Sequence, residues 1–357
     1  MSSGATGFTT GTCAAAAAKA ATMVVCGFPT PAEVEISLPD GARVCLPVET
    51  ADCNSISARA AVRKHAGDDP DVTDKCLISV QVELANGDDI IFLAGEGVGT
   101  VTKPGLSVAP GEPAINPAPR SMIRDAVREV TDLGLRITVS IPGGRELAAK
   151  TFNPRLGVEG GLSILGTSGI VRPFSAAALR DALKCSLSVA VACNLRNPVL
   201  VPGRIGSRAA GTLFELSPQQ SIEVSNEWGF VLDQAVKVDF HGLMILGHPG
   251  KLAKLAAGCW DTHSSRSDSA VPSVLDLARD ILERNLPESR TVEGIFTDLP
   301  GQDRRKLADA LAGRIRKAVS GRVLGRFEIA VVLVNMQGVL LGLDGDFQAW
   351  TWKTGPS

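Results

Sequence analysis

The chain of 357 residues contains no tyrosine, and aromatic residues make up only 4% of it. Proteins that bind single-stranded nucleic acid stack the bases on aromatic side chains, so this composition argues against that function. A charge excess is also missing, since the net charge is −2. Without a basic surplus the surface has little attraction for phosphate backbones or anionic lipids. We therefore expect neither a nucleic acid nor a membrane as a partner.

Paired cysteines are absent as well. None of the eight cysteines stands in a Cys-x-x-Cys pair, and their spacings match no zinc or iron–sulfur pattern. His248, Cys259 and His263 show no recognised ligand spacing either. We expect no protein-bound metal, and free thiols in a reducing cytoplasm.

A long hydrophobic run is the third absence. The most apolar N-terminal segment, Ala14 to Val25, contains Lys19 and has no basic region before it. These features do not fit a signal peptide or a membrane span. They predict a soluble helix from about Cys13 to Cys26, capped by one of three nearby threonines, at 9, 10 and 12.

The length allows two domains. Residues 1–173 predict an α+β domain with glycine-rich loops. Pro39-Asp40-Gly41 indicates a hairpin between strands at 33–38 and 43–48, and Asn86-Gly87 indicates another between strands at 77–84 and 90–93. A helix at 120–131 and a strand at 136–141 follow.

Residues 174–357 show a different hydrophobic pattern, in which short apolar runs alternate with helical patterns. This alternation predicts an α/β domain, Rossmann-like with a largely parallel sheet. The predicted strands are 199–201, 221–224 and 242–246, and the predicted helices are 175–193, 226–238, 251–257, 274–285 and 303–319. A hairpin of strands at 328–334 and 339–343 should close the chain.

A glycine-rich stretch joins the two parts. Leu162 to Leu165 reads as a buried strand that enters a turn, Gly166-Thr167-Ser168-Gly169. Glycine lets a ligand approach the backbone, and the two hydroxyls can donate hydrogen bonds. The turn is therefore a candidate binding loop, although close packing alone would also explain its glycines.

Two further loops imitate known phosphate-binding motifs without matching them. Gly95-x-Gly97-x-Gly99 has the wrong spacing for a dinucleotide fingerprint, and Pro104 blocks the helix that should follow. Gly250-Lys251 lacks the P-loop spacing and its hydroxyl residue. Both remain candidate binding surfaces rather than nucleotide sites.

Gly247-His248-Pro249-Gly250 follows a predicted strand and opens a predicted helix. Ligands in open α/β sheets bind at such carboxyl ends of strands, and a helix N-terminus favours negative charge. Lys251 fits that setting, although a solvated helix face is the plainer alternative. The carboxylates of Asp68, Asp69 and Asp71 either serve as a general base or cap a turn, and the turn is favoured.

Seven motifs in order resemble the CbiD family, the cobalt-precorrin-5B (C-1)-methyltransferases of anaerobic cobalamin synthesis. They are Gly-Phe-Thr-Thr-Gly-Thr-Cys-Ala at 7–14, Gly-Asp-Asp-Pro-Asp-Val-Thr at 67–73, Gly-Glu-Gly-Val-Gly-Thr-Val-Thr-Lys-Pro-Gly-Leu at 95–106, Glu-Pro-Ala-Ile-Asn-Pro at 112–117, Lys-Thr-Phe-Asn-Pro-Arg-Leu-Gly at 150–157, Gly-Lys-Leu-Ala-Lys-Leu-Ala-Ala-Gly at 250–258 and Thr-His-Ser at 262–264. The segment after the last motif, 265–272, departs from the family, which commonly has Ala-Asp-Gly-Arg and a glutamate soon after: Asp268 corresponds to the aspartate, but the arginine and the glutamate that follow it are missing.

The resemblance implies methylation of a cobalt-containing tetrapyrrole at C-1 by S-adenosylmethionine, with the cobalt carried by the substrate. We expect the methyl donor near the two glycine turns, at Gly166, Thr167, Ser168, Gly169, Gly247 and Gly250. Lys103, Arg120, Arg155 and Lys251 are expected to hold the tetrapyrrole carboxylates, and His248 and His263 to orient the macrocycle or accept a proton. A non-catalytic tetrapyrrole-binding protein and a nucleotide-binding phosphotransferase are the alternatives. A homo-oligomer stays open.

Overall fold

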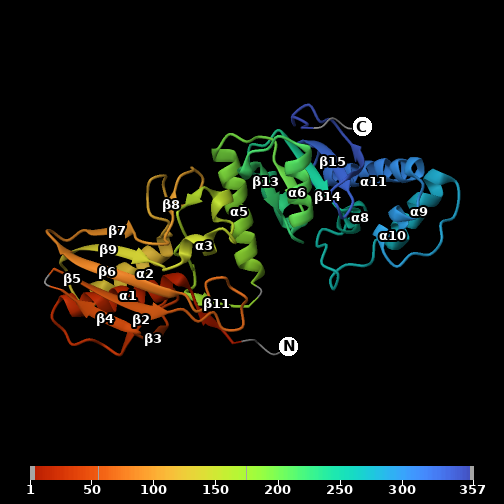
Figure 1. The fold of residues 1–357 in the computed structure, drawn as a ribbon. Helices are drawn as coiled ribbons and strands as arrows, with labels where there is room; N and C mark the ends of the chain where they lie inside the picture. The colour runs from red at the N-terminus through yellow and green to blue at the C-terminus, as the bar shows by residue number, and fades with distance from the viewer. Residues whose placement is uncertain (1–4, 55, 174, 354–357) are drawn as a thin grey trace. The chain divides into compact units, whose positions relative to one another are not determined.

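The structure, a computed structural model, describes residues 5–54, 56–173 and 175–353 (Figure 1). The chain divides into two compact units, Met1–Ala176 and Ala177–Ser357, called here the N-terminal and C-terminal units. A separate hydrophobic cluster fills each of them. No helix of the described residues is long and apolar enough to cross a membrane.

A five-stranded sheet forms the centre of the N-terminal unit. Its strand order is β4 (Thr50–Cys53), β5 (Ser57–Arg63), β6 (Leu77–Ala85), β9 (Gly134–Ser140) and β7 (Ile90–Ala94). All neighbours are antiparallel except β7 and β9, which are parallel. β4 and β5 were not predicted from the sequence.

Two helices cover this sheet (Figure 1). The alanine-rich α1 (Thr10–Val25) packs against β5, β6 and α2 (Pro117–Arg128), and its alanines allow the close approach. Thr9 caps α1 by accepting a hydrogen bond from the Thr12 N–H. The predicted helix is thereby confirmed.

Smaller elements complete the N-terminal unit. The first predicted hairpin is confirmed as β2 (Glu33–Ser37) paired with β3 (Arg43–Pro47). Two short antiparallel pairs join distant loops: β1 (Gly7–Phe8) with β11 (Ile170–Val171), and β8 (Thr100–Val101) with β10 (Val158–Glu159). The short helices α3 (Gly144–Ala148) and α4 (Asn153–Leu156) lie between β9 and β10 in the chain.

The second predicted hairpin is wrong. The Asn86-Gly87 turn reverses the chain, but β6 and β7 do not pair, because β9 lies between them. Leu135, Ile137 and Val139 of β9 are fully buried, as expected for a strand that has a neighbour on each side. That arrangement depends on a strand about 50 residues away from the turn, which local turn chemistry does not reveal.

The strand predicted at Leu162 to Leu165 is also absent. Leu162 and Ile164 are buried, but each makes only an isolated bridge, to Val98 and Ile115 respectively. Two bridges to different partners do not build a ladder. The segment is therefore an irregular, partly buried connection rather than a strand entering a turn.

The C-terminal unit contains the predicted largely parallel sheet. Its order is β13 (Ser221–Glu223), β12 (Val199–Val201), β14 (Gly242–Gly247), β15 (Glu328–Val334) and β16 (Leu340–Asp344). The first four strands are parallel, and β16 pairs antiparallel with β15, which confirms the terminal hairpin. Alternate residues of these strands belong to two hydrophobic clusters, as the two faces of a buried sheet require.

The helices of this unit are α5 (Ala176–Ala192), α6 (Arg204–Leu213), α7 (Trp228–Ala235), α8 (Pro249–Ala256), α9 (Val271–Leu282), α10 (Val292–Thr297) and α11 (Gly301–Arg322) (Figure 1). α6 and α10 were not predicted from the sequence. Two glycines weaken the helical propensity of α6, and burial of Ala209 and Ala210 against the sheet compensates.

Strand order reverses at β12. The chain passes from β12 to β13 on one side and then to β14 on the other side of β12. Because these strands are parallel, the segments after β12, β13 and β14 all leave the same edge of the sheet. Ligands of open α/β sheets bind at the carboxyl edge near such a reversal.

Candidate functional site

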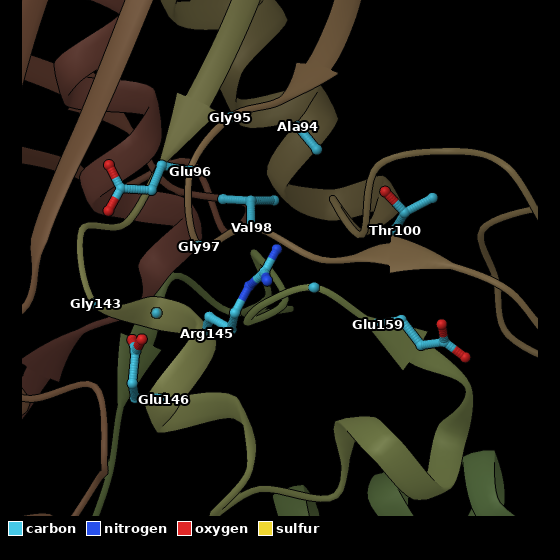
Figure 2. Close-up of a pocket in the computed structure, with 12 residues that line it drawn as sticks. Ala94, Gly95, Glu96, Gly97, Val98, Thr100, Gly143, Arg145, Glu146 and Glu159 are labelled. Carbon is cyan, nitrogen blue, oxygen red and sulfur yellow. The ribbon is translucent and has the colours of Figure 1, made fainter.

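A cavity of about 450 Å³ opens in the N-terminal unit (Figure 2). Three chain segments form its walls: the connection from β7 to β8, the turn that begins α3, and the end of β10. Its size lies within the range of small-molecule sites. The lining residues are Ala94, Gly95, Glu96, Gly97, Val98, Thr100, Gly143, Gly144, Arg145, Glu146, Glu159 and Gly160.

Close backbone contacts explain several of the glycines in and beside this cavity. Gly97 has a φ of +70°, and a Cβ there would lie 2.0 Å from the Ile141 carbonyl oxygen. A Cβ on Gly144 or Gly161 would lie 2.4 Å or 2.2 Å from the Gly97 carbonyl oxygen. The loops that contain Gly97, Gly144 and Gly161 therefore pass so close to one another that none of these positions can hold a side chain. The Gly95-x-Gly97-x-Gly99 motif builds this wall, and β8 rather than a helix follows it.

Carboxylates dominate the charge of the cavity. Glu96, Glu146 and Glu159 line the cavity together with a single basic residue, Arg145, which Figure 2 shows reaching toward Val98. Glu159 accepts a hydrogen bond from the Thr102 hydroxyl at 3.2 Å.

Within the part of the chain that the structure describes, Arg145 has no carboxylate within ion-pair distance. The net negative charge favours a cationic ligand. Sequence reasoning found the Gly95 loop but missed Arg145, Glu146 and Glu159, because nothing in their local sequence marks them.

The glycine turn at 166–169 belongs to the N-terminal unit and packs on the start of α1. A Cβ on Gly166 would lie 2.4 Å from the Thr9 Cβ, and one on Gly169 would lie 2.7 Å from the Leu38 Cδ2. The Gly169 carbonyl accepts a hydrogen bond from the Thr12 hydroxyl at 2.6 Å. Packing thus explains both glycines, whereas Thr167 and Ser168 lie exposed on the turn.

The three cationic residues expected to bind carboxylates in this unit have different surroundings. Lys103 is exposed, and the base of its side chain covers Gly157. Arg120 donates to the Ile115 and Pro113 carbonyls at 2.8 and 3.2 Å and pairs with Glu112 at 3.2 Å.

Arg155 lies half-buried in α4. Arg120 is thus committed to holding its own loop, whereas Lys103 is accessible to a ligand.

The aspartate cluster forms a turn, the reading favoured from the sequence. Asp71 pairs with Lys64 at 2.8 Å and accepts from the Thr73 N–H and hydroxyl. Asp68 accepts from the Ala5 N–H at 2.6 Å. Nearby, burial raises the pKa of the Cys13 thiol to about 12, which keeps this thiol protonated and unreactive at neutral pH.

His248 lies at the carboxyl edge of the C-terminal sheet, as the N-cap of α8. Its Nδ1 accepts the Gly250 N–H at 3.0 Å, and its Nε2 contacts a carboxylate oxygen of Glu293 on α10. Both ring nitrogens are therefore engaged, and Nε2 carries the proton when Nδ1 accepts. A Cβ on Gly247 would lie 2.6 Å from the Pro202 Cδ, so this glycine also serves packing.

Two lysines and a neutral polar group lie beside this cap. Lys251 Nζ donates to Asn226 Oδ1 at 3.2 Å, and the Thr262 hydroxyl donates to the same oxygen at 3.2 Å. Lys254 is buried, and its Nζ contacts the Ser267 hydroxyl at 2.8 Å and the Thr262 carbonyl at 3.4 Å. The pKa of Lys251 is lowered by burial of its ammonium and by the charge of Lys254. Sequence reasoning found Lys251 but did not choose Lys254.

His263 belongs to the loop that follows α8. Its Nδ1 contacts the Ser265 hydroxyl at 2.7 Å, and its backbone N–H donates to Asp261 at 3.0 Å. Among the residues placed by the structure, no group of three or more histidine, cysteine or acidic side chains is arranged to hold a metal ion.

Comparisons with known proteins agree over nearly the whole chain. The CbiD family model matches residues 2–173, and the model for the CbiD C-terminal domain matches 261–345. A curated relative from Syntrophotalea carbinolica, named cobalt-precorrin-5B C(1)-methyltransferase, is 54% identical over 96% of this chain and 98% of its own length. Relatives of the same name from Moorella thermoacetica and Methanocaldococcus jannaschii are 41% and 40% identical, covering 95% and 94% of this chain and 94% and 95% of their own.

A crystal structure of the cobalamin biosynthesis protein CbiD from Archaeoglobus fulgidus is 29% identical to this chain. The match covers 73% of this chain and 82% of that one, with a TM-score of 0.38.

Proposed function

Because the chain belongs to the CbiD family, we propose that it transfers the methyl group of S-adenosylmethionine to C-1 of cobalt-precorrin-5B and so forms cobalt-precorrin-6A in cobalamin biosynthesis. The observation that carries the proposal is the 54% identity to a relative of that name over 98% of the relative's length. Cobalt arrives with the substrate. The eight free cysteines fit the cytoplasm as the location.

The chemistry asks the protein mainly for positioning. A sulfonium methyl group is already activated, so neither a covalent nucleophile nor a bound metal is required. Methyl transfer needs the ring carbon and the methyl group in line at roughly 3–3.5 Å. Binding groups that hold the two substrates are therefore the residues to identify.

The charge of the N-terminal cavity suits the methyl donor better than the tetrapyrrole. S-adenosylmethionine carries a sulfonium, an ammonium and one carboxylate, which complement three glutamates and Arg145. The acetate and propionate groups of a tetrapyrrole would meet repulsion from Glu96, Glu146 and Glu159. We infer that Arg145 holds the donor carboxylate and that the glutamates face its cationic groups and hydroxyls.

The alternative donor site is the turn Gly247 to Gly250. The parallel strands and flanking helices of the C-terminal unit are Rossmann-like in our interpretation, and this turn follows β14 at the carboxyl edge. Gly166 to Gly169 is the weaker alternative, since packing already explains its glycines.

Titration with S-adenosylhomocysteine separates these placements. Arg145→Gln should weaken binding about ten- to a hundredfold, because one charged hydrogen bond is lost. Arg136→Gln, an exposed arginine on β9, is the control and should bind as the wild type. Unchanged affinity in Arg145→Gln would move the donor to the Gly247 turn.

The activity itself is tested with cobalt-precorrin-5B and methyl-labelled S-adenosylmethionine under anaerobic conditions. We expect the tetrapyrrole to gain one labelled methyl group at C-1. Tetrapyrrole binding without transfer would instead support a non-catalytic binding protein. Stabilisation by ATP but not by S-adenosylhomocysteine would support a phosphotransferase.

We propose that Lys103, Arg155 and Lys251 help to hold the tetrapyrrole carboxylates. Each alanine variant should bind the substrate about ten- to a hundredfold more weakly. Arg120, which was expected to act with them, is engaged by Glu112 and two carbonyls, so its replacement should mainly loosen its loop. Unchanged substrate affinity in the first three variants would contradict their assignment.

Histidine participation is a separate proposal. His263 is the better candidate for proton transfer, because its described contacts involve Nδ1 and leave Nε2 for a ligand. General-base help is worth about 10²–10⁴-fold in rate. His263→Gln and His248→Asn are to be compared in single-turnover methyl transfer, and losses below about tenfold in both would assign them structural roles.

A further inference from the structure

Lys254 is a buried cation without a carboxylate partner. Only 8% of its surface is exposed, and its Nζ contacts two neutral oxygens, the Ser267 hydroxyl at 2.8 Å and the Thr262 carbonyl at 3.4 Å. No carboxylate of the described residues lies within ion-pair distance of it. The other buried lysine, Lys64, is 1% exposed and pairs with Asp71 at 2.8 Å. Burying an unpaired charge costs several kcal/mol, so Lys254 stands out energetically.

Lys251 adds a second positive charge one helical turn earlier. Residues three apart lie on the same side of a helix. The pKa of Lys251 is lowered by burial and by the charge of Lys254, and no acidic group counters that effect. Two adjacent cations without a counter-charge among the described residues repel each other. A bound anion would relieve this repulsion.

Two acidic residues, Glu227 beside Asn226 and Asp261 in the loop after α8, are engaged with arginines. Glu227 pairs with Arg180 at 2.7 Å. Asp261 pairs with Arg266 at 3.0 Å and also accepts the His263 N–H. Neither of these two carboxylates forms an ion pair with Lys251 or Lys254 in the described residues.

Donor capacity remains for a ligand. An ammonium has three N–H donors, and the described contacts use two at Lys254 and one at Lys251. Asn226 directs its Oδ1 toward Lys251 and Thr262, which leaves its amide N–H groups free to donate.

Asn226 and Lys251 lie where the fold places ligands, and Lys254 lies one helical turn further along, in the last turn of α8. Asn226 follows β13, and the two lysines belong to α8, which follows β14. Both segments leave the carboxyl edge of the parallel strands, next to the strand-order reversal at β12.

We propose that Lys254 and Lys251, assisted by Asn226, form a binding site for a ligand carboxylate. The proposal rests on the function proposed above, whose two substrates both carry carboxylates. With the donor carboxylate held by Arg145, the carboxylate at the lysines belongs to an acetate or propionate group of the tetrapyrrole. Binding of the donor's methionine carboxylate here would instead place the donor at the Gly247 turn. Ammonium–carboxylate hydrogen bonds are among the strong ones in proteins.

Lys254→Met and Lys251→Met test the site, because methionine removes the charge and keeps much of the length. Lys306→Met, an exposed lysine on α11, is the control. Each variant is titrated anaerobically with cobalt-precorrin-5B and, separately, with S-adenosylhomocysteine. The ligand that supplies the carboxylate should bind about ten- to a hundredfold more weakly to both site variants and normally to the control.

Thermal unfolding separates binding from a structural role. Removing an uncompensated buried charge should leave the Tm of Lys254→Met unchanged or raise it. A lower Tm together with normal affinity for both ligands would overturn the site, as would a wild type that binds neither ligand.

Methyl transfer is assayed independently. If the lysine variants bind the ligand more weakly but the wild type transfers no methyl group, the site is kept and the proposed function is refuted. Methyl transfer by the wild type together with unaltered ligand affinities in both site variants would keep the function and refute the site.

Discussion

Asp71 shows how a single residue organises the region after β5. It accepts hydrogen bonds from Lys64 at 2.8 Å and from the N–H and hydroxyl of Thr73, both at 2.7 Å. Lys64 is 1% exposed, so its charge has little access to water. The pair therefore differs from the exposed ion pair formed by the adjacent Arg63 with Glu49.

Lys64→Met should lower the free energy of unfolding by about 3 kcal/mol, because it leaves the Asp71 carboxylate without its buried partner. Arg63→Met, the matched control at the neighbouring position, should cost less than about 1 kcal/mol. Urea denaturation of both variants measures the difference. Equal effects would contradict the importance given to burial.

The same pair predicts acid sensitivity. Burial favours a higher pKa for Asp71, but hydrogen bonds from Lys64 and Thr73 outweigh it and lower the pKa below the usual value. The folded state thus binds this proton less readily than the unfolded state. The stabilisation is present above the unfolded pKa, about 4, and is lost as the pH falls through the folded pKa.

Urea midpoints of the wild type and of Asp71→Asn between neutral pH and the acid range check this prediction. The variant should be less stable at neutral pH and should lose less stability on acidification. Parallel curves for the two proteins would show that Asp71 does not contribute.

At the scale of an element, α8 depends on the residue that caps its N-terminus. His248 caps the helix through Nδ1 and contacts Glu293 through Nε2. His248→Ala should cost about 1 kcal/mol of stability, the usual effect of losing an N-cap, while His248→Asn should cost less because asparagine also caps. Urea denaturation measures both, and an equally small effect of the two variants would argue against the capping role.

The loops around the N-terminal cavity give a second prediction for an element. Gly97→Ala should lower stability by about 3 kcal/mol or more, since the left-handed backbone is strained and the new methyl group overlaps the Ile141 carbonyl. Gly143→Ala is the matched control, with a φ of +72° and nothing within 4 Å of the added carbon. It should cost only about 1–2 kcal/mol, from the backbone strain alone. Thermal or urea unfolding measures both variants. Equal losses of stability would show that the Gly97 backbone lies farther from the Ile141 carbonyl than the structure indicates.

At the scale of the whole molecule, each compact unit contains its own core. One cluster is built from α1 and the sheet around β6, and the other from the helices around β14. We therefore expect residues 1–176 and 177–357 to fold when expressed separately. Cooperative thermal unfolding and dispersed amide resonances of each fragment are the measurements, and a fragment that stays unfolded would show that its core is insufficient alone.

Local sequence was enough wherever a structure depends on neighbouring residues. The caps and alanines of α1, the β2–β3 hairpin and the β15–β16 hairpin follow from turn residues and periodicity a few positions apart. The alternation of short apolar runs and helices likewise predicted a largely parallel sheet in the C-terminal unit. The ordered motifs identified the family, because they retain residue types at fixed spacings.

Tertiary structure alone decided which distant segments meet. It placed β9 between β6 and β7, reduced Leu162 and Ile164 to isolated bridges, and gathered Arg145 and Glu159 around the Gly97 loop. It also buried Lys254 without a carboxylate partner among the described residues. These arrangements depend on packing between segments far apart in the chain, where local propensity carries no information about the partner.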